Sequence, residues 1–502
     1  IGLFNTSGAT ITLSGAVKAQ ALSLGANNGT ATFGSATIAN EVSLTANTQQ
    51  LTFNKTSALN GGFDFNGFSG TVTVDSAAGN NTLTGAITSH NSTAGTLAIT
   101  GGANTVTFAS AIGETSSHRV GLITVAASTT AVFSSTVYSQ QINLSGTAKF
   151  NGNVNGALAF TSTGTIQLYD GGAISGAVDN TGTANQGTLT FNGSGSVSGA
   201  IGATKALASI GLINASNAAV TLSDNVTTKA ITLGANAGSA TFGGTTKIND
   251  AVNFTAAGQN ITFKGTTDLA NGINLKGFAS TVTLDSTSAS KTLTGAVTTA
   301  TNDTGTLAIE GANTFTVANA VGSNGNALSS VTIADSSNAI FSSTIHANAL
   351  TVGTGSATFN DAVTAAINLK GGTITLADGK SIQGAVDSTT GSGALIVSGT
   401  STISGLVGNT AALTSISAGA ASNTATFSSA VKATTITIGA GTAAFNGNVT
   451  GALVIGTTGG TVNIADGKSV TGTITNTSGG ATGTINASGA LTVTGAIGSS
   501  GN

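Results

Sequence analysis

The sequence predicts an all-β protein whose chain winds into an elongated β-solenoid (β-helix) with coils of about 20 residues. Three features predict this fold: short segments alternate polar and apolar residues, one phrase with a single aromatic recurs, and apolar positions return every 20 or 21 residues. With coils of about 20 residues stacked about 4.8 Å apart, 502 residues would form a rod of about 25 coils and about 120 Å.

The alternating segments are the predicted strands. "TITLSGAV" (10–17), "TVTVDSA" (71–77) and "TITLADG" (373–379) place small polar and apolar residues in turn, which is the two-residue period of a strand. Turns rich in Gly, Asn and Asp, such as "GANNG" and "ADGK", separate them. The chain has no Pro, and this suits strands because Pro removes a ladder hydrogen bond.

The spacing of apolar residues predicts two strands per coil. One series is separated by 20, 20 and 21 residues and comprises Leu13, Phe33, Phe53 and Val74; a second comprises Leu24, Leu44 and Phe65. Within "TATFSSAV" (424–431), the residues Phe427 and Val431 are expected on one face of a single strand, with Ser429 between them.

The recurring aromatic predicts a column of stacked rings inside the solenoid. The phrase reads "TATFGSATI" at 30–38 and returns as "SATFGGTTKI" (239–248), "SATFNDAV" (356–363), "TATFSSAV" (424–431) and "TAAFNGNV" (442–449). Equivalent side chains of successive coils stack on one another. We therefore expect buried, inward-pointing rings at Phe33, Phe53, Phe242, Phe263, Phe359, Phe427 and Phe445.

A longer repeat lies over the coils. "IGLFNTSGATITLSGAV" at Ile1 matches "IGLINASNAAVTLSDNV" at Ile210. A phrase of a small residue, an aliphatic residue and Gly closes each module: "SAIG" (110–113), "GAIG" (199–202), "NAVG" (319–322), "GLVG" (405–408) and "GAIG" (495–498). These phrases predict modules at 1–113 (long), 114–202 (short), 203–322 (long, repeating the first), 323–408 (short, repeating the second) and 409–502 (short, a third copy).

The two ends of the sequence abut in this repeat. "GAIGSSGN" (495–502) is a module end with the start of a lead, and "IGLFNTS" (1–7) is the later part of a lead. Since the chain starts at Ile1 without a signal peptide, we expect either a piece of a longer array or coils that stack head to tail on the next molecule.

The composition excludes several classes of protein. Charged residues are 6%, the net charge is −3, Cys is absent and the mean hydropathy is +0.30. These values argue against disorder, nucleic-acid binding, a disulfide scaffold and thiol-ligated metal. No apolar run is long enough to span a membrane as a helix. We expect no nucleic-acid partner and no membrane insertion by this segment.

Candidate chemical residues are few and scattered. The histidines are His90, His118 and His346; Ala300 and Tyr138 replace the first and last in the other repeat copy, and surface positions are expected. "ADGKS" at 377–381 and 465–469 lacks the first Gly of a P-loop, since Ile374 and Val462 occupy that position, and it predicts an Asp-Gly turn. Turn positions are likewise expected for Asp64, Asp75, Asp170, Asp285, Asp378 and Asp466, although stacking could bring Asp64 and Asp75 together.

We therefore expect a protein that is not an enzyme, with no catalytic, cofactor-binding or metal-binding residues. A structural Ca²⁺ held by turn aspartates at a subunit contact is the one cofactor left open. Thr-x-Thr pairs such as Thr71/Thr73 suggest an ice-binding face, but "QQLTF" (49–53) and "QNITF" (259–263) interrupt the column, and Thr is also a good strand residue.

Repeats such as "TATFSSAVKATTITIGAGTAAFNGNVTGAL" (424–453), with Cys and Pro absent, resemble the passenger regions of bacterial autotransporters. They are most similar to rickettsial outer-membrane surface antigens and related S-layer-like proteins. This resemblance covers most of the chain and implies an extracellular β-solenoid used for adhesion or as a coat. It carries over no catalytic residues.

The sequence thus predicts an extracellular structural protein that forms a rod, fibre or surface layer on a bacterial cell and associates with itself. The alternative is an adhesin that binds a host receptor or glycan. Its binding segment would be "GETSSHRVGL" (113–122), which departs from the repeats and holds the only arginine, Arg119. An ice-binding solenoid is a remote third interpretation.

Overall fold

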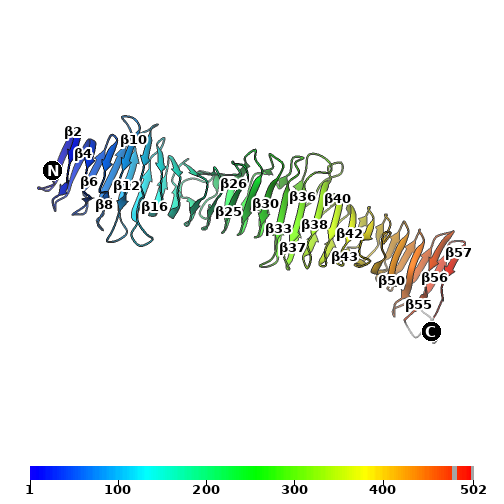
Figure 1. Cartoon of the computed structure of the whole chain (residues 1–502). Coiled ribbons are helices and arrows are strands. Elements are labelled where there is room, and N and C mark those ends of the chain that lie inside the picture. Colours follow the sequence, from blue (N-terminus) through cyan, green and yellow to red (C-terminus); the bar gives the residue numbers. More distant parts are fainter. Residues whose placement is uncertain (478–482, 499–502) are drawn as a thin grey trace. The chain divides into compact units, whose positions relative to one another are not determined.

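A computed structural model describes residues 1–477 and 483–498, and these residues form only strands, turns and bends. The strands pair in parallel from coil to coil, in about 23 turns of about 21 residues. The predicted β-solenoid is confirmed. The chain divides into two compact units, Ile1–Asp250 and Ala251–Asn502, and in each unit strands of successive coils lie side by side (Figure 1). In the described part of the chain no helix is long and apolar enough to cross a membrane.

The first apolar series stacks in register. Its residues lie on β2 (Ala9–Ala19), β4 (Gly29–Ile38), β6 (Gln50–Phe53) and β9 (Thr71–Asp75). Leu13 pairs with Phe33, Phe33 with Phe53 and Phe53 with Val74. Later coils vary in length, since the coil that joins Ile99 to its partner Val125 is longer than the coil that joins Leu144 to Phe160. Longer corners therefore give about 23 coils in place of the expected 25.

The prediction of two strands per coil is wrong for the two coils that follow β4 and β5 (Val42–Ser43). One coil holds β6, β7 (Ser57–Leu59) and β8 (Phe63–Asp64), and the next holds β9, β10 (Asn81–Thr84) and β11 (Ile87–Thr88). Each strand pairs with its counterpart in the next coil. A coil thus has three faces. The second predicted series lies along the face of β8, which Phe65 follows directly, so the face that went unpredicted is that of β7 and β10, whose strands are only three and four residues long.

"TATFSSAV" is also not a single strand. Phe427 ends β49 (Thr424–Phe427) and Val431 begins β50 (Val431–Ile438). Both side chains are buried, as expected, while Ser428 and Ala430 are exposed. The alternation of burial continues through a corner between two faces, because a short bend can preserve the inward and outward order without ladder hydrogen bonds.

The aromatic core is confirmed. All seven predicted rings are at most 1% exposed, namely Phe33, Phe53, Phe242, Phe263, Phe359, Phe427 and Phe445. Phe33 stacks on Phe53 with ring centroids 5.3 Å apart, and Phe427 stacks on Phe445 at 5.1 Å. The stacking follows from strand pairing, since it holds identical positions of successive coils about one strand spacing apart.

The module-closing phrases have a common backbone structure. Their aliphatic residues, Ile112, Ile201, Val321, Val407 and Ile497, each bridge in parallel to a neighbouring coil without belonging to a longer strand. The following glycines have φ between 65° and 84°. At Gly408 a Cβ would lie 2.0 Å from the Lys432 carbonyl oxygen. These phrases are single-residue corners where coils approach too closely for any residue but Gly.

The module bounds remain a prediction, and the division between the compact units falls at 250/251, inside the predicted module 203–322. Part of the expected C-terminal stacking segment, 499–502, lies outside the described residues.

Candidate functional site

The densest group of titratable side chains lies on a short three-stranded sheet in the first unit. Its strands are β5 (Val42–Ser43), β8 and β11, which pair in parallel, and Ile112 bridges to Ile87 beyond them. The charged-cluster residues, as we call them, lie on or beside these strands on four successive coils: Glu41, Asp64, His90 and Glu114. Two of the three Glu and one of the three His of a sparsely charged chain thus meet at one corner.

Asp64 is the buried member of the charged cluster, with 6% of its side chain exposed. Its Oδ1 accepts hydrogen bonds from the backbone N–H of Asn66 at 2.8 Å and of His90 at 3.0 Å. The first bond closes the expected turn. The second joins Asp64 to the next coil, so that a buried carboxylate is supplied with the donors it needs.

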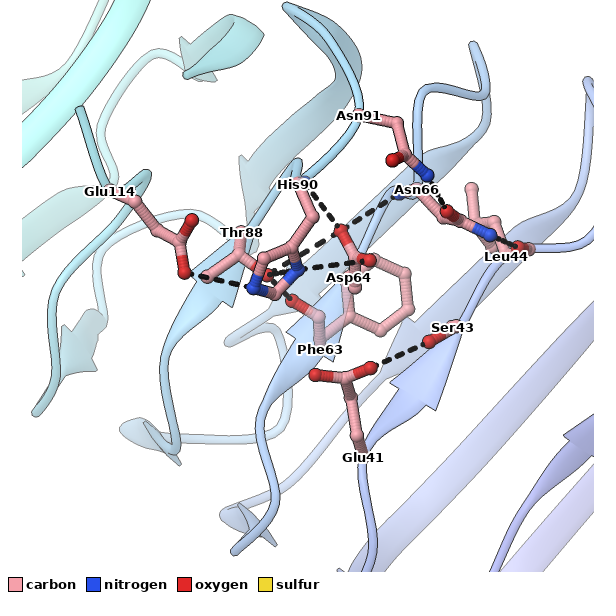
Figure 2. Close-up of polar contacts among 10 residues, drawn as sticks. All are labelled: Glu41, Ser43, Leu44, Phe63, Asp64, Asn66, Thr88, His90, Asn91 and Glu114. Atoms are coloured by element: carbon pink, nitrogen blue, oxygen red, sulfur yellow. Dashed lines mark hydrogen bonds and ion pairs between the residues drawn. The ribbon is translucent and has the colours of Figure 1, made fainter. Parts of the chain in front are cut away.

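The His90 imidazole lies between two carboxylates (Figure 2). Its Nδ1 is 3.1 Å from Asp64 Oδ2, and its Nε2 is 2.9 Å from Glu114 Oε1. The hydrogen bond with Asp64 is the main cause that raises the pKa of His90 above its ordinary value of 6.5, with the charges of Asp64, Glu114 and Glu41 adding to it and desolvation opposing it. The side chain is 45% exposed.

Neighbouring polar groups hold this arrangement in place. The Thr88 hydroxyl donates to the Phe63 carbonyl at 3.1 Å and lies 3.3 Å from His90 Nδ1. Asn91 donates its amide to Asn66 Oδ1, and Ser43 donates its hydroxyl to Glu41 at 2.9 Å. The Thr88 and Asn91 contacts join adjacent coils, whereas Ser43 and Glu41 lie on the same coil (Figure 2).

The second unit has the same scaffold without the charges. Its short sheet comprises β29 (Val252–Asn253), β32 (Ile273–Asn274) and β35 (Val297–Thr298). Asn274 stands at the repeat position of Asp64 and accepts from the Lys276 backbone N–H at 2.8 Å, and Ala300 stands at that of His90. The fold at this corner therefore forms without the ion pairs, and the charges are a property of the first copy.

The geometry favours charge pairing over catalysis or metal binding. Asp64 and Glu114 contact different ring nitrogens of His90, so the two carboxylates approach the ring from different sides and both nitrogens are engaged. A general base or a metal ligand needs a ring nitrogen that faces substrate or metal. Among residues 1–477 and 483–498 no group of three or more His, Asp or Glu is placed to hold a metal ion.

The sequence predicted a surface position for His90 and no partners for it. Its side chain is largely accessible, but both carboxylate contacts went unpredicted. Asp64 and Glu114 each lie further from His90 along the chain than one predicted coil length, so the predicted period would align His90 with other positions. Asp75 instead accepts from the Ala77 N–H in its own turn at 3.0 Å. The signal that could have found the cluster is the longer spacing of Ile87 and Ile112 within the repeat.

The remaining turn aspartates follow two patterns. Asp285 accepts from the Thr287 N–H at 2.8 Å in its own turn, as Asp75 does. A second group accepts from a backbone N–H of the following coil at 2.6–2.8 Å and comprises Asp170, Asp378 and Asp466. The Asp-Gly turn prediction for "ADGKS" is confirmed, with φ at 73° for Gly379. Asp170, Asp378 and Asp466 therefore join adjacent coils through these hydrogen bonds.

The other two histidines lie apart in the fold. His118 belongs to a turn in which its N–H donates to Thr115 Oγ1 at 3.1 Å. His346 is on β40 (Ile345–Val352), where its N–H donates to the Val321 carbonyl at 2.7 Å. Both side chains are half-buried.

The threonine column is interrupted as the sequence predicted. Gln50 lies between Thr30 and Thr71 in the strand register. The preceding Gln49 is fully buried, and its amide nitrogen donates to the carbonyls of Gly25 and Asn27 at 2.7 and 2.9 Å. The segment "QQLTF" (49–53) that interrupts the threonine column therefore also bonds to a corner of the preceding coil.

Comparison with known proteins gives one partial match. The chain is 36% identical over 293 residues to the Outer membrane protein A of Rickettsia rickettsii, a match that covers 52% of this chain and 12% of that protein. This relative is of the rickettsial surface-antigen type that the repeats resemble. No family model matches the chain. No solved structure matches it either.

Proposed function

We propose that the chain is a non-enzymatic structural segment of a bacterial surface protein. The observation that carries this proposal is that the recurring turn and corner sequences of the chain form contacts between its own coils. The Asp-Gly turns, the buried Gln49 and the module-closing glycines all join one coil to the next. The partial match to an outer membrane protein supports a position at the cell surface.

Self-association into a rod, fibre or layer is the second part of the proposal. Every coil pairs with its neighbour through parallel ladders whose side chains stack like on like, as Phe427 does on Phe445. An unpaired ladder of this kind is a template for another chain. We propose that coil edges of separate molecules stack in the same way, and sedimentation over a range of concentrations tests this step.

Surface location can be tested by labelling because the chain has no Cys. Thr221→Cys places a thiol at an exposed position of a strand, and Ser139→Cys places one at a fully buried position. A membrane-impermeant maleimide should label Thr221→Cys on intact cells and leave Ser139→Cys unlabelled. Labelling of Thr221→Cys only after lysis would contradict the proposed location.

Adhesion is the second candidate function, and the charged cluster favours it. The segment 113–122 that departs from the repeats lies against His90 through Glu114. An exposed turn held at a charged corner is the kind of feature that binds a glycan or a receptor. Replacing 113–119 with the repeat segment 322–327 should abolish binding to host cells if this segment is the binding site, and should change nothing if the chain is only a coat.

A further inference from the structure

The turn 113–119, which follows the Ile112 bridge one coil beyond β11, is held to the neighbouring coil by the Glu114 side chain. Gly113 leaves the coil with its N–H donating to the Ile87 carbonyl at 2.6 Å. The turn then closes on itself, since the Glu114 N–H donates to the His118 carbonyl at 2.9 Å. Thr115, Ser116 and Ser117 are exposed. The Glu114 carboxylate reaches back to His90 and ties the turn to the coil below.

This tie depends on the protonation of the imidazole for a geometric reason. A neutral imidazole carries one N–H, so one nitrogen would present a lone pair to a carboxylate that can only accept. Nδ1 faces Asp64 at 3.1 Å and Nε2 faces Glu114 at 2.9 Å. Only the imidazolium donates to both, so both contacts are favourable together only in the charged form.

We propose that His90 is a pH-sensitive clasp that holds the turn 113–119 in acid and releases it as the pH rises. The charged groups that face the ring are Asp64, Glu114 and, further off, Glu41, all acidic. On deprotonation Asp64 keeps the remaining N–H, because it is buried and fixed by backbone donors. The exposed Glu114 then faces a lone pair and moves away with its turn.

The sign of the effect follows from the His90 titration. Its pKa is raised by the hydrogen bond to Asp64 first and by the surrounding acidic charges. The clasp is therefore closed below the ordinary value of 6.5 and opens as the pH passes through the higher folded-state pKa. The second repeat copy lacks the device because Ala300 stands at the position of His90.

A spin label on the turn tests the proposal directly. Ser116→Cys introduces the only thiol of the chain at an exposed position, and a nitroxide attached there reports the mobility of the turn. We expect an immobilised spectrum at pH 5.5 and a mobile one at pH 9, with a midpoint above 6.5. In the Ser116→Cys/His90→Ala variant, which copies the repeat residue, the label should be mobile at both pH values.

Two further variants make the result specific. His118→Ala removes the other titratable ring of the turn and should leave the transition unchanged. Glu114→Gln replaces the acceptor-only carboxylate with an amide that can also donate to the neutral ring, so the turn should stay immobilised when the pH rises. A Ser116→Cys spectrum that stays constant from pH 5.5 to 9, or a transition that persists without His90, would overturn the clasp.

Discussion

At the scale of single residues, inward-pointing aromatic rings form part of the core, and rings of successive coils stack on one another. Phe427 is fully buried and stacks on Phe445. Such positions could be predicted from the sequence because burial in a strand follows a two-residue period. The stacked neighbours follow from the coil period, which is regular wherever the corners are short.

We predict that Phe427→Ala destabilises the coils around it by about 3–5 kcal/mol. The loss should stay within neighbouring coils because each coil contacts only the next. Hydrogen exchange mapped along the chain measures this, and Phe427→Leu, which keeps most of the volume, is the matched control. Equal loss of protection in both units would contradict the local coupling.

Asp387 is a residue whose charge we expect to contribute to stability. Burial of the carboxylate acts to raise its pKa, but the Thr410 hydroxyl and the backbone N–H groups of Ser388, Thr410 and Ala411 donate to it and lower the pKa below 3.8. The stabilisation is therefore present above pH 3.8 and is lost as the pH falls through the lower folded-state pKa.

The expected result is that Asp387→Asn unfolds at a lower temperature than wild type at pH 7, and that the difference shrinks below pH 3.8. Circular dichroism melting curves from pH 7 to pH 2 measure both effects. If the difference between the two proteins is the same at every pH, the charge of Asp387 does not contribute to stability.

The charged cluster shows why parts of the site could not be predicted. Asp64, His90 and Glu114 lie on successive coils, and no local pattern marks them as neighbours. Their meeting depends on the lengths of two coils, which are set by corner turns of variable size. A constant coil period therefore predicts the fold and misses the contacts at this corner.

At the scale of the structural elements, glycine corners decide how closely the coils approach. Gly408 combines φ of +65° with a neighbouring carbonyl 2.0 Å from the place of a Cβ, whereas Gly379 has φ of +73° and open space around it. The module-closing phrases were recognisable in the sequence, but their function as bridges was not, because it depends on the facing coil.

This contrast predicts the outcome of two matched substitutions. Gly379→Ala should cost about 1–2 kcal/mol, since an L-residue there pays only for the left-handed backbone. Gly408→Ala should cost more, because the Lys432 carbonyl must also move. Thermal unfolding monitored by circular dichroism compares the two, and equal stability of both variants would refute the role of the close approach.

Strands on the faces of the two predicted apolar series were evident from the sequence, and the strands of the face between them were not. β7 and β10 have three and four residues, and neither contains a residue of the two predicted series. The third face of the coil is therefore absent from the predicted coil and present in the structure.

At the scale of the whole molecule, the proposed function rests on a repeating coil whose side chains mostly contact the adjacent coils. The number and length of coils could be predicted approximately, about 25 against about 23, because insertions at corners lengthen some turns. The proposal of a surface coat combines two observations. Polar groups of the chain are used for contacts between its own coils, and the chain partially matches an outer membrane protein.

Electron microscopy of the bacterial surface, with antibody-gold directed against this chain, tests that claim most directly. We expect gold on the outside of intact cells along fibres or a continuous layer, and the purified chain should form assemblies of the same repeat. Gold confined to the cell interior, together with a purified chain that stays monomeric at every concentration, would contradict the account.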